Sequence, residues 1–347
     1  MVFFDQGSKG KKMIRAPKFW YDNSKASSRV LAFILSPLSW VFDAVVQLRF
    51  KTNTQLKTSV PIICIGNLVV GGAGKTPTVA AIADFLVDEL GMRGYILSHG
   101  YKGLVTGPLK VDTTKHTSQE VGDEALLLAE HAPTWVSKDR RNGIVDMTKS
   151  GANIIIMDDG HQNPHLQKRV SLIVVDGGAG FGNGKVFPGG PLRETEQNGL
   201  KRADCVVIIG EDKVNVTEEI HTIDPKIPVF MASIVPTGTE HIKDQKIVGF
   251  AGIGRPEKFL HTLEDAGAEV LKFFDFPDHH PYKESDIAPI MKHAEELGGK
   301  VFTTEKDYVR LPLVYKDRIE VVPIMLQWKN VEELTTFMKS KLRPSSV

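Results

Sequence analysis

The stretch that decides the fold is residues 66–76, which read G-N-L-V-V-G-G-A-G-K-T. It follows an apolar run, P-I-I-C-I-G (61–66), that is typical of a buried strand, and it precedes an amphipathic helical pattern. The stretch ends in G-K-T, as the phosphate-binding template G-x-x-x-x-G-K-[ST] does, but Val69 stands where the template has its first glycine. Two interpretations follow: a nucleotide site on a differently built loop, or a glycine turn after a strand.

The chemistry of phosphate binding favours the nucleotide site. Consecutive backbone N–H groups at the start of a helix surround a phosphate, a lysine neutralises its charge, and a Ser or Thr hydroxyl reaches Mg²⁺. Three glycines before the lysine supply the backbone freedom that the template takes partly from its first glycine, so Val69 is expected just outside the phosphate loop. The predicted cofactor-binding residues are Gly71, Gly72, Ala73, Gly74, Lys75 and Thr76.

A second motif supports this interpretation. Residues 153–160, N-I-I-I-M-D-D-G, read as a buried strand that ends in two acidic residues. P-loop enzymes hold Mg²⁺ beside the β- and γ-phosphates with a carboxylate in such a place. An apolar strand that ends in aspartate is common by itself, but downstream of a phosphate loop it is stronger evidence for a Mg-ATP site. The two motifs together predict a Mg-ATP site with Thr76, Asp158 and Asp159 as the metal ligands.

From residue 60 onward, short β-type runs alternate with helical patterns, which indicates βαβ units and a mostly parallel sheet. A second α/β set begins near residue 228. The predicted fold class is therefore α/β, with a P-loop NTPase-like domain and a second, smaller α/β lobe. The predicted divisions are a basic N-terminal segment (1–58), a kinase core (59–218) and a second lobe (219–347) whose last helix could pack back on the core.

Composition limits the class of protein. The chain has 347 residues, of which 41% are hydrophobic and 24% charged, and this balance excludes disordered and fibrous classes. The two cysteines, Cys64 and Cys205, lie in apolar runs that read as strands, so neither is expected to bind a metal or form a disulfide. A reducing cytosol fits this usage best.

The N-terminal segment is basic and apolar. Residues 1–58 carry ten Lys or Arg against three Asp or Glu, about +7 in a chain whose net charge is +1, which predicts an anionic partner. Residues 30–48 form a helical pattern with a broad apolar stripe and a narrow polar strip of Ser36, Ser39, Asp43 and Gln47. The stripe consists of Leu31, Ile34, Leu38, Val41, Val45 and Leu48.

Three interpretations of this helix remain open. It could lie in an anionic leaflet, since each surface cation contributes roughly 1 kcal/mol to such binding. It could span the bilayer, although Pro37 and Asp43 interrupt the apolar run, or it could pack against the main domain. Membrane association is the interpretation we favour. Residues 1–12 precede a second methionine, Met13, and are expected to lie outside the fold.

Candidate catalytic groups gather where loops or strand ends are predicted. Asp123 begins a helix in V-G-D-E, where a carboxylate is often only a cap. The pair His279-His280 lacks the further ligands of a zinc site. Phosphoryl transfer to an alcohol instead requires a base that accepts the hydroxyl proton. Residues 181–194 form a Gly- and Pro-rich loop with Arg193 near its end, either a solvated connection or a phosphate clamp.

Taken together, the motifs make a specific resemblance. In order from about Ala16 to Asp307, the chain resembles the tetraacyldisaccharide 4'-kinase family, the lipid A kinases of Gram-negative bacteria. The motifs that carry the resemblance are A-P-K-F-W-Y, G-N-L-V-V-G-G-A-G-K-T-P, L-S-H-G-Y-K-G, V-G-D-E, M-D-D-G-H-Q-N, F-G-N-G-K-V-F-P-G-G-P-L-R-E, G-F-A-G-I-G-R-P-E-K-F, F-P-D-H-H-P-Y and T-T-E-K-D.

The resemblance implies an activity and a location. The family transfers the γ-phosphate of ATP to the 4'-hydroxyl of a tetraacylated glucosamine disaccharide 1-phosphate during lipid A biosynthesis. This reaction takes place at the cytoplasmic face of the inner membrane, which agrees with a peripheral, amphipathic N-terminus. The implied cofactors are ATP and Mg²⁺. The implied partners are the acylated lipid substrate and an anionic membrane surface, with no nucleic acid and no obligatory protein partner.

The resemblance also implies residue roles. Lys75 and Thr76 would serve the phosphates and Mg²⁺, and both aspartates at the end of the 153–160 stretch would serve the metal. Asp123 would be the general base for the acceptor hydroxyl, and His279 would orient it, with His280 the weaker choice. Arg140 and Arg193 would be phosphate ligands.

The chain departs from the family pattern at three positions. Ala73 stands where the family often has Thr, and His161 and Asn163 vary the residues around D-D-G-x-Q, so that His161 adds an imidazole near the predicted metal.

Two rival functions are open. One rival function is a soluble small-metabolite kinase on the same loop. The other is a nucleotide-dependent ATPase or switch whose hydrolysis drives partner binding.

Overall fold

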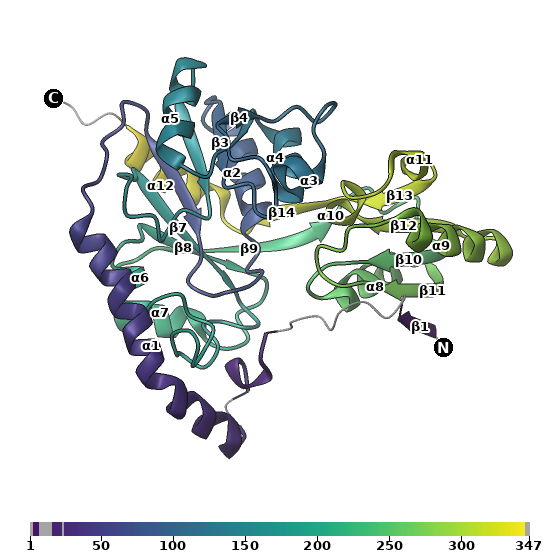
Figure 1. Ribbon diagram of the computed structural model, residues 1–347, viewed down its shortest axis with the longest axis horizontal. Coiled ribbons are helices and arrows are strands. Elements are labelled where there is room, and N and C mark those ends of the chain that lie inside the picture. The colour runs from purple at the N-terminus through teal and green to yellow at the C-terminus, as the bar shows by residue number, and fades with distance from the viewer. Residues whose placement is uncertain (1–2, 7–15, 23, 344–347) are drawn as a thin grey trace.

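The computed structural model describes residues 3–6, 16–22 and 24–343 and divides them between two sheets (Figure 1). A nine-stranded sheet organises the part that we call the core lobe. A five-stranded sheet organises the second lobe. Figure 1 shows the two lobes side by side, with β9 (Val229–Pro236) and β14 (Ile324–Trp328) running between them.

The nine-stranded sheet is mostly parallel, which confirms the predicted fold class. Only its two edge pairs, β14 with β9 and β4 with β5, are antiparallel. The central strands are buried along their whole length because helices cover both faces, as parallel sheets require. The strand order is β14 (Ile324–Trp328), β9 (Val229–Pro236), β8 (Cys205–Ile209), β7 (Val170–Asp176), β2 (Ile62–Gly66), β6 (Ile154–Asp158), β3 (Gly94–Ser98), β5 (Thr134–Val136) and β4 (Leu109–Lys110).

Helices cover the two faces of this sheet. The first face carries α2 (Lys75–Asp88), α4 (Asp123–His131) and α12 (Val331–Leu342), so the last helix packs on the core lobe. The opposite face carries α5 (Arg140–Lys149), α6 (Glu196–Leu200) and α7 (Val216–Ile223).

The segment around Asp123 forms two helices. A short α3 (Ser118–Val121) ends at Gly122, whose φ of 88° is favourable only for glycine, and α4 begins at the next residue. Asp123 is therefore the first residue of α4, as the sequence indicated.

The second lobe is built on a wholly parallel sheet. Its strand order is β1 (Phe3–Gln6), β11 (Glu269–Asp275), β10 (Lys246–Ala251), β12 (Lys300–Thr304) and β13 (Ile319–Val322). Its helices are α8 (Pro256–Asp265), α9 (Glu284–Leu297), α10 (Glu305–Tyr308) and α11 (Leu313–Lys316). Because β1 pairs with β11, the expectation that the first residues lie outside the fold is wrong for Phe3–Gln6. The other residues before Met13 lie outside the described residues.

The sheet membership of two strands differs from the sequence-based division. β9 was assigned to the second lobe but hydrogen-bonds with β8 in the nine-stranded sheet. Pro323 separates β13 (Ile319–Val322) in the second lobe from β14 in the core lobe. Proline cannot donate a ladder hydrogen bond, so the chain changes sheet there. The chain thus passes between the lobes after β1, after β9 and before β14.

The N-terminal helix α1 (Ala26–Thr52) lies along the outside of the core lobe (Figure 1). Within the described ranges it is the one helix long and apolar enough to cross a membrane, judged by length and composition alone. Its apolar side chains face away from the protein: Phe33 is 78% exposed and Trp40 is 74% exposed. Packing of the apolar stripe against the main domain, one of the three open interpretations, is therefore wrong.

The polar strip of α1 faces the core lobe instead. The Ser39 hydroxyl is buried, donates to the Val186 carbonyl at 2.6 Å and accepts from the Gly189 N–H at 3.1 Å. Asp43 accepts from the backbone N–H of Thr195 at 3.1 Å. The helix is attached to the protein through hydrogen bonds, which leaves its broad apolar face free.

The Gly- and Pro-rich loop 181–194 receives this N-terminal segment. Trp20, in the short helix η1 (Lys18–Trp20), is buried and donates its indole N–H to the Pro188 carbonyl at 3.2 Å. Phe187 packs against both Trp20 and Phe42 of α1. The loop is neither a solvated connection nor only a clamp, because much of it is a docking surface for α1 and η1.

Replacing Ser39 with alanine tests this attachment. The substitution leaves the buried Val186 carbonyl and Gly189 N–H without their partner, which should lower the free energy of unfolding by about 1–3 kcal/mol. Urea unfolding in detergent measures the change. Ser36→Ala is the matched control, since the Ser36 hydroxyl bonds only the Ala32 carbonyl of its own helix. Equal losses in both variants would contradict the proposed attachment.

Candidate active site

The phosphate loop connects β2 to α2 at the carboxyl edge of the large sheet. Gly74 has a φ of 87°, and a Cβ there would lie 3.2 Å from Ile209, so the position requires glycine. Val69 is buried and forms a β-bridge with Leu192 of the neighbouring loop. Its side chain belongs to the hydrophobic core beneath the loop, which explains how valine replaces the template glycine.

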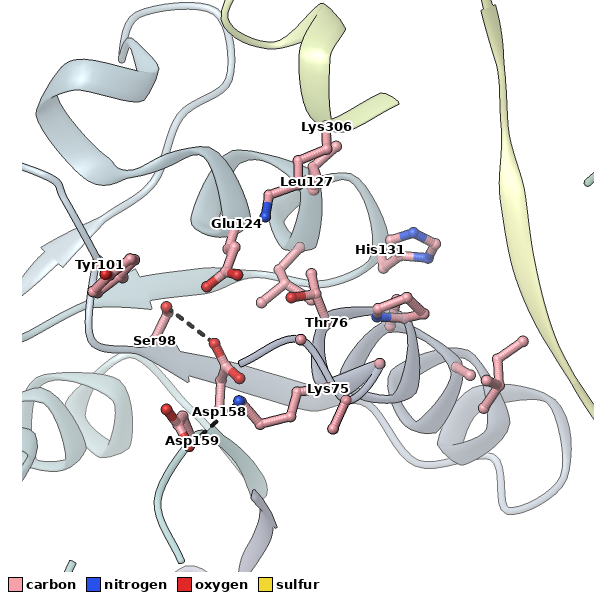
Figure 2. A pocket seen from close by; sticks show the side chains of 18 of the residues that line it. Lys75, Thr76, Ser98, Tyr101, Glu124, Leu127, His131, Asp158, Asp159 and Lys306 are labelled. Atoms are coloured by element: carbon pink, nitrogen blue, oxygen red, sulfur yellow. Dashed lines mark hydrogen bonds and ion pairs between the residues drawn. The ribbon is translucent and has the colours of Figure 1, made fainter. Parts of the chain in front are cut away.

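A large cleft of about 2080 Å³ lies between the lobes. Its lining includes every predicted cofactor-binding residue from Gly71 to Thr76. The second lobe contributes His279, Lys306 and residues of α8 to the same cleft. Figure 2 shows Lys306 from the second lobe above and Lys75 and Thr76 from the core lobe below, with Glu124 between these levels and the two aspartates beside Lys75.

Asp158, the last residue of β6, lies in the floor of this cleft. It is buried, and Ser98 donates a hydrogen bond to it at 3.4 Å. In Figure 2 the carboxylate of Glu124 faces the same space. Burial, and then the negative charges of Glu124 and Asp159, raise the pKa of the Asp158 carboxyl to about 7. Such a site is electrostatically short of positive charge.

Asp159 is surrounded by cations. Its carboxylate accepts from Arg193 at 2.9 and 3.1 Å and lies 3.8 Å from the Lys75 ammonium. Burial alone would raise the pKa of Asp159, but Lys75 and Arg193 lower it below its ordinary value. The residue also has a φ of 48°, a strained conformation of the kind that clusters at functional sites.

Arg140, the other predicted phosphate ligand, is buried at the start of α5. Its guanidinium donates to the carbonyls of Leu97 at 3.2 Å and Asp159 at 3.1 Å. These contacts hold the ends of β3 and β6 together beneath the cleft. Arg140 lines the cleft, and phosphate binding by it stays a prediction.

The structure brings Asp123 and His279 together although 156 residues separate them. Nδ1 of His279 lies 2.7 Å from Oδ2 of Asp123, whose other oxygen accepts from the backbone N–H of Glu124. Asp123 is 4% exposed and belongs to the core lobe, whereas His279 belongs to the second lobe. The pair therefore exists only where the lobes meet. His279 has a φ of 62°, a second strained position at the cleft.

Two cations around this pair were not predicted. Arg310 is almost fully buried, with Nε 3.7 Å from Oδ2 of Asp123, and the Lys306 ammonium lies 3.3 Å from Nε2 of His279. Burial would raise the pKa of Asp123, but the hydrogen bond from His279 and the charges of Lys306 and Arg310 lower it below its ordinary value. Asp123 is thus an ionised acceptor at neutral pH. The T-T-E-K-D motif contained the signal for Lys306, but nothing connected it to His279.

The other two histidines of interest lie outside the site. His280 contacts Asp286 at 3.0 Å and packs against Phe276 and Tyr282. His161 is completely buried, where it contacts the Ser171 hydroxyl and the Gly199 carbonyl at 3.0 Å each. Burial and nearby positive charges lower the pKa of His161 to about 3, so it is neutral. The expectation that its imidazole competes near the metal is wrong.

The side chains at the cleft suit a nucleotide-bound metal better than a protein-only metal site. Within the described ranges, no group of three or more His, Cys, Asp or Glu is arranged to hold a metal ion. Mg²⁺ in kinases is held by one or two carboxylates together with substrate phosphates. The predicted ligands Thr76, Asp158 and Asp159 all line the cleft beside the phosphate loop.

The comparisons with known proteins agree with this geometry. Residues 31–343 match the family model described as tetraacyldisaccharide-1-P 4'-kinase. The tetraacyldisaccharide 4'-kinase of Paramagnetospirillum magneticum is 44% identical over 93% of this chain and 97% of its own length. That of Rhodospirillum rubrum is 44% identical over 90% of this chain and 93% of its own length.

A solved structure is similar as well. The "apo" form of LpxK from Aquifex aeolicus in complex with ATP has a TM-score of 0.73 and 27% identity, over 90% of this chain and 99% of that one. The family resemblance seen in the motifs is confirmed. The chain belongs to the tetraacyldisaccharide-1-P 4'-kinase family.

Proposed function

We propose that this protein transfers the γ-phosphate of ATP to the 4'-hydroxyl of a tetraacyldisaccharide 1-phosphate in lipid A biosynthesis. The observation that carries the proposal is the contact of 2.7 Å between Asp123 and His279, a residue that lines the same cleft as the phosphate loop. A family relationship over most of the chain supports the choice of acceptor.

The phosphate loop and α2 bind the nucleotide. Backbone N–H groups from Gly71 to Gly74 surround the terminal phosphates at the N-terminus of α2, where the helix dipole favours negative charge. Lys75 and Thr76 follow at the first two positions of the helix. The ATP complex of the Aquifex aeolicus relative supports ATP as the phosphoryl donor.

Asp158 and Thr76 are the residues that would hold Mg²⁺, with Asp159 beside them. Asp159 already pairs with Lys75 and Arg193, whereas Asp158 lacks a cation within ion-pair distance among the described residues. The argument that Mg²⁺ fits this site rests on the raised pKa of Asp158. Too little positive charge lies near this carboxyl, and a divalent cation would supply it. When bound, Mg²⁺ would neutralise negative charge on the phosphates of ATP.

Asp123 acts as the general base. Its carboxylate accepts the proton of the 4'-hydroxyl while that oxygen forms a bond to the γ-phosphorus. The bond between the γ-phosphorus and the β,γ-bridging oxygen breaks, and ADP leaves. His279 orients the carboxylate through the contact at Oδ2. Arg193, which lines the cleft beside Asp159, is available to contact a phosphate.

The exposed apolar face of α1 supports a location of the enzyme at the cytoplasmic face of the inner membrane. A broad apolar face with basic residues near both helix ends is the pattern of an interfacial helix. Lys25 precedes the helix, and Arg49 and Lys51 lie in its last turns. Arg49 also lines the cleft, so the membrane-facing helix and the active-site cleft are contiguous.

Two rival functions make different predictions. A soluble small-metabolite kinase has no use for a helix that exposes Phe33 and Trp40. A nucleotide-dependent switch does not need a general base in addition to the phosphate loop, since it transfers no phosphate to an alcohol.

The direct test supplies purified protein with Mg-ATP and the disaccharide 1-phosphate lipid and measures product mass. Intact nucleotide binding without an added phosphate on the lipid would refute the proposal.

Lys75→Met tests the phosphate loop. Loss of a charge-assisted hydrogen bond to phosphate removes about 1.5–3 kcal/mol, which should weaken ATP binding about tenfold to a hundredfold. Isothermal titration with ATP measures the affinity. Lys149→Met, at the far end of α5, is the control and should bind ATP as the unmodified protein does. Unchanged ATP affinity in Lys75→Met would place the phosphates elsewhere.

A further inference from the structure

The contact between Lys306 and His279 determines which nitrogen of the His279 imidazole carries a proton. The Lys306 ammonium is 3.3 Å from Nε2 of His279. An ammonium group has three donors and no acceptor, so Nε2 must be the acceptor in this contact. Nε2 therefore carries no proton in the arrangement that the structure shows.

The second imidazole nitrogen completes the assignment. Nδ1 of His279 lies 2.7 Å from Oδ2 of Asp123. An ionised carboxylate only accepts hydrogen bonds, so Nδ1 is the donor and carries the proton. The two contacts together define a neutral His279 in a single tautomer.

We propose that Lys306 is a positioning residue that keeps His279 neutral with its proton on Nδ1, and so assigns proton acceptance to Asp123 rather than His279. The proposal rests on the proposed function for its kinetic consequence. With Nε2 occupied by Lys306, the imidazole has no free lone pair with which to deprotonate a hydroxyl. The carboxylate of Asp123 is then the basic group of the pair.

The other groups that face His279 do not reverse this assignment. Asp278 on the same loop would favour a proton on Nε2, but its Oδ1 lies 3.8 Å away and also 3.7 Å from the Lys306 ammonium. Arg310 approaches Asp123, which adds positive charge beside the pair. The ring of Tyr101 packs edge-on against the imidazole, with ring centres 5.8 Å apart.

A competing explanation is that Lys306 binds a substrate phosphate. Lys306 lines the cleft, and Figure 2 shows its side chain extending from the second lobe toward Glu124. A phosphate ligand would act mainly on substrate affinity. A positioning residue would act on kcat and on the pH profile and would leave KM largely unchanged.

The first experiment reads the tautomer directly and requires no lipid, so it is independent of the proposed function. Protein labelled with ¹⁵N at its 11 histidines is studied by long-range ¹H–¹⁵N correlation near neutral pH, and His279→Gln assigns the signal. We expect neutral His279 with the proton on Nδ1, and an imidazolium signal at the same pH in Lys306→Met. A proton on Nε2 in the unmodified protein, or an unchanged signal in Lys306→Met, would overturn the proposal.

The second experiment measures kcat and KM of Lys306→Met against pH. A positioned base contributes about 10²–10⁴-fold, and loss of its positioning alone should lower kcat about tenfold. Without the lysine charge, the pair of Asp123 and His279 loses a nearby cation, so the acid limb of the kcat profile should move to higher pH. A raised KM for ATP or lipid with an unmoved acid limb would instead show phosphate binding and would refute the proposal.

Two further variants separate charge from fold. Lys306→Arg keeps a cation that only donates, so it should keep the tautomer and the acid limb of the unmodified protein. Lys316→Met removes a lysine that packs on Tyr308, ten residues along the chain, and should alter neither measurement. An acid limb shifted equally in Lys306→Met and Lys316→Met would contradict a role specific to Lys306.

Discussion

Asp123→Asn is expected to lower kcat for lipid phosphorylation by about 10²–10⁴-fold, the share of the rate that a positioned base contributes. The amide keeps the shape of the carboxylate but cannot accept the hydroxyl proton. ATP affinity should be unchanged, because no contact joins Asp123 to the phosphate-loop residues Gly71–Thr76 in the described part of the chain. Measurement of kcat by product mass and of ATP affinity by titration checks both expectations.

Two variants complete this test. Asp265→Asn, an exposed aspartate at the end of α8, is the matched control and should keep the full rate. His279→Ala combined with Asp123→Asn should be no slower than Asp123→Asn alone, because groups that act as a unit do not contribute additively. A kcat in Asp123→Asn close to that of the control would eliminate Asp123 as the base.

Replacement of three outward-facing residues of α1, Phe33→Ser, Trp40→Ser and Val41→Ser, should weaken vesicle binding by about a thousandfold. The three side chains are 78%, 74% and 63% exposed. Burial of such a side chain contributes about 1.5–3 kcal/mol, so three of them contribute at least about 4 kcal/mol, which corresponds to that factor. Flotation with vesicles that contain phosphatidylglycerol measures the change.

The control for this variant carries equally exposed apolar residues elsewhere. Leu313 and Val314 of α11 in the second lobe are 81% and 75% exposed, and Leu313→Ser with Val314→Ser should float as the unmodified protein does. The free energy of unfolding of the triple variant should be unaltered, since its side chains make no core contact. Equal flotation of the triple variant and the unmodified protein would refute membrane binding through this face.

The sequence predicted the fold class because its signals are local. The buried parallel strands are short apolar runs, and the G-K-T at the start of a helix marks the phosphate loop without help from distant residues. The sheet to which each strand belongs is not a local property. β9 and β14 have ordinary strand patterns, and only pairing across about 90 residues places them together in the core lobe.

The orientation of α1 could be predicted only in part. The polar strip and the apolar stripe were evident from helical spacing, but the usual rule turns an apolar stripe toward the protein. The polar side is turned toward the protein here because Ser39 and Asp43 form hydrogen bonds with the backbone of residues 186–195. A backbone N–H or carbonyl leaves no trace in residue identity, so composition could not reveal this interface.

The site shows the same limit. Asp123 and His279 were paired through a family resemblance, since their spacing in sequence says nothing of contact. Lys306 of α10 and Arg310 in the turn after this helix lie beside that pair, a contact that only the meeting of the two lobes creates. The expectation for His161 is wrong because a residue two positions from Asp159 in the sequence need not share its site. The His161 side chain points into the core.

The division of Asp123 and His279 between the lobes has a consequence for how this chain can vary. The donor site is encoded by one continuous region, from the phosphate loop to the end of β6, and its geometry depends on a single sheet. The acceptor site is encoded by no continuous region, and its geometry depends on how two independently packed bodies meet. A shift of an ångström between the lobes would separate His279 from Asp123 while the phosphate loop keeps its geometry, so substitutions at the lobe boundary can slow the reaction without changing a residue of the phosphate loop.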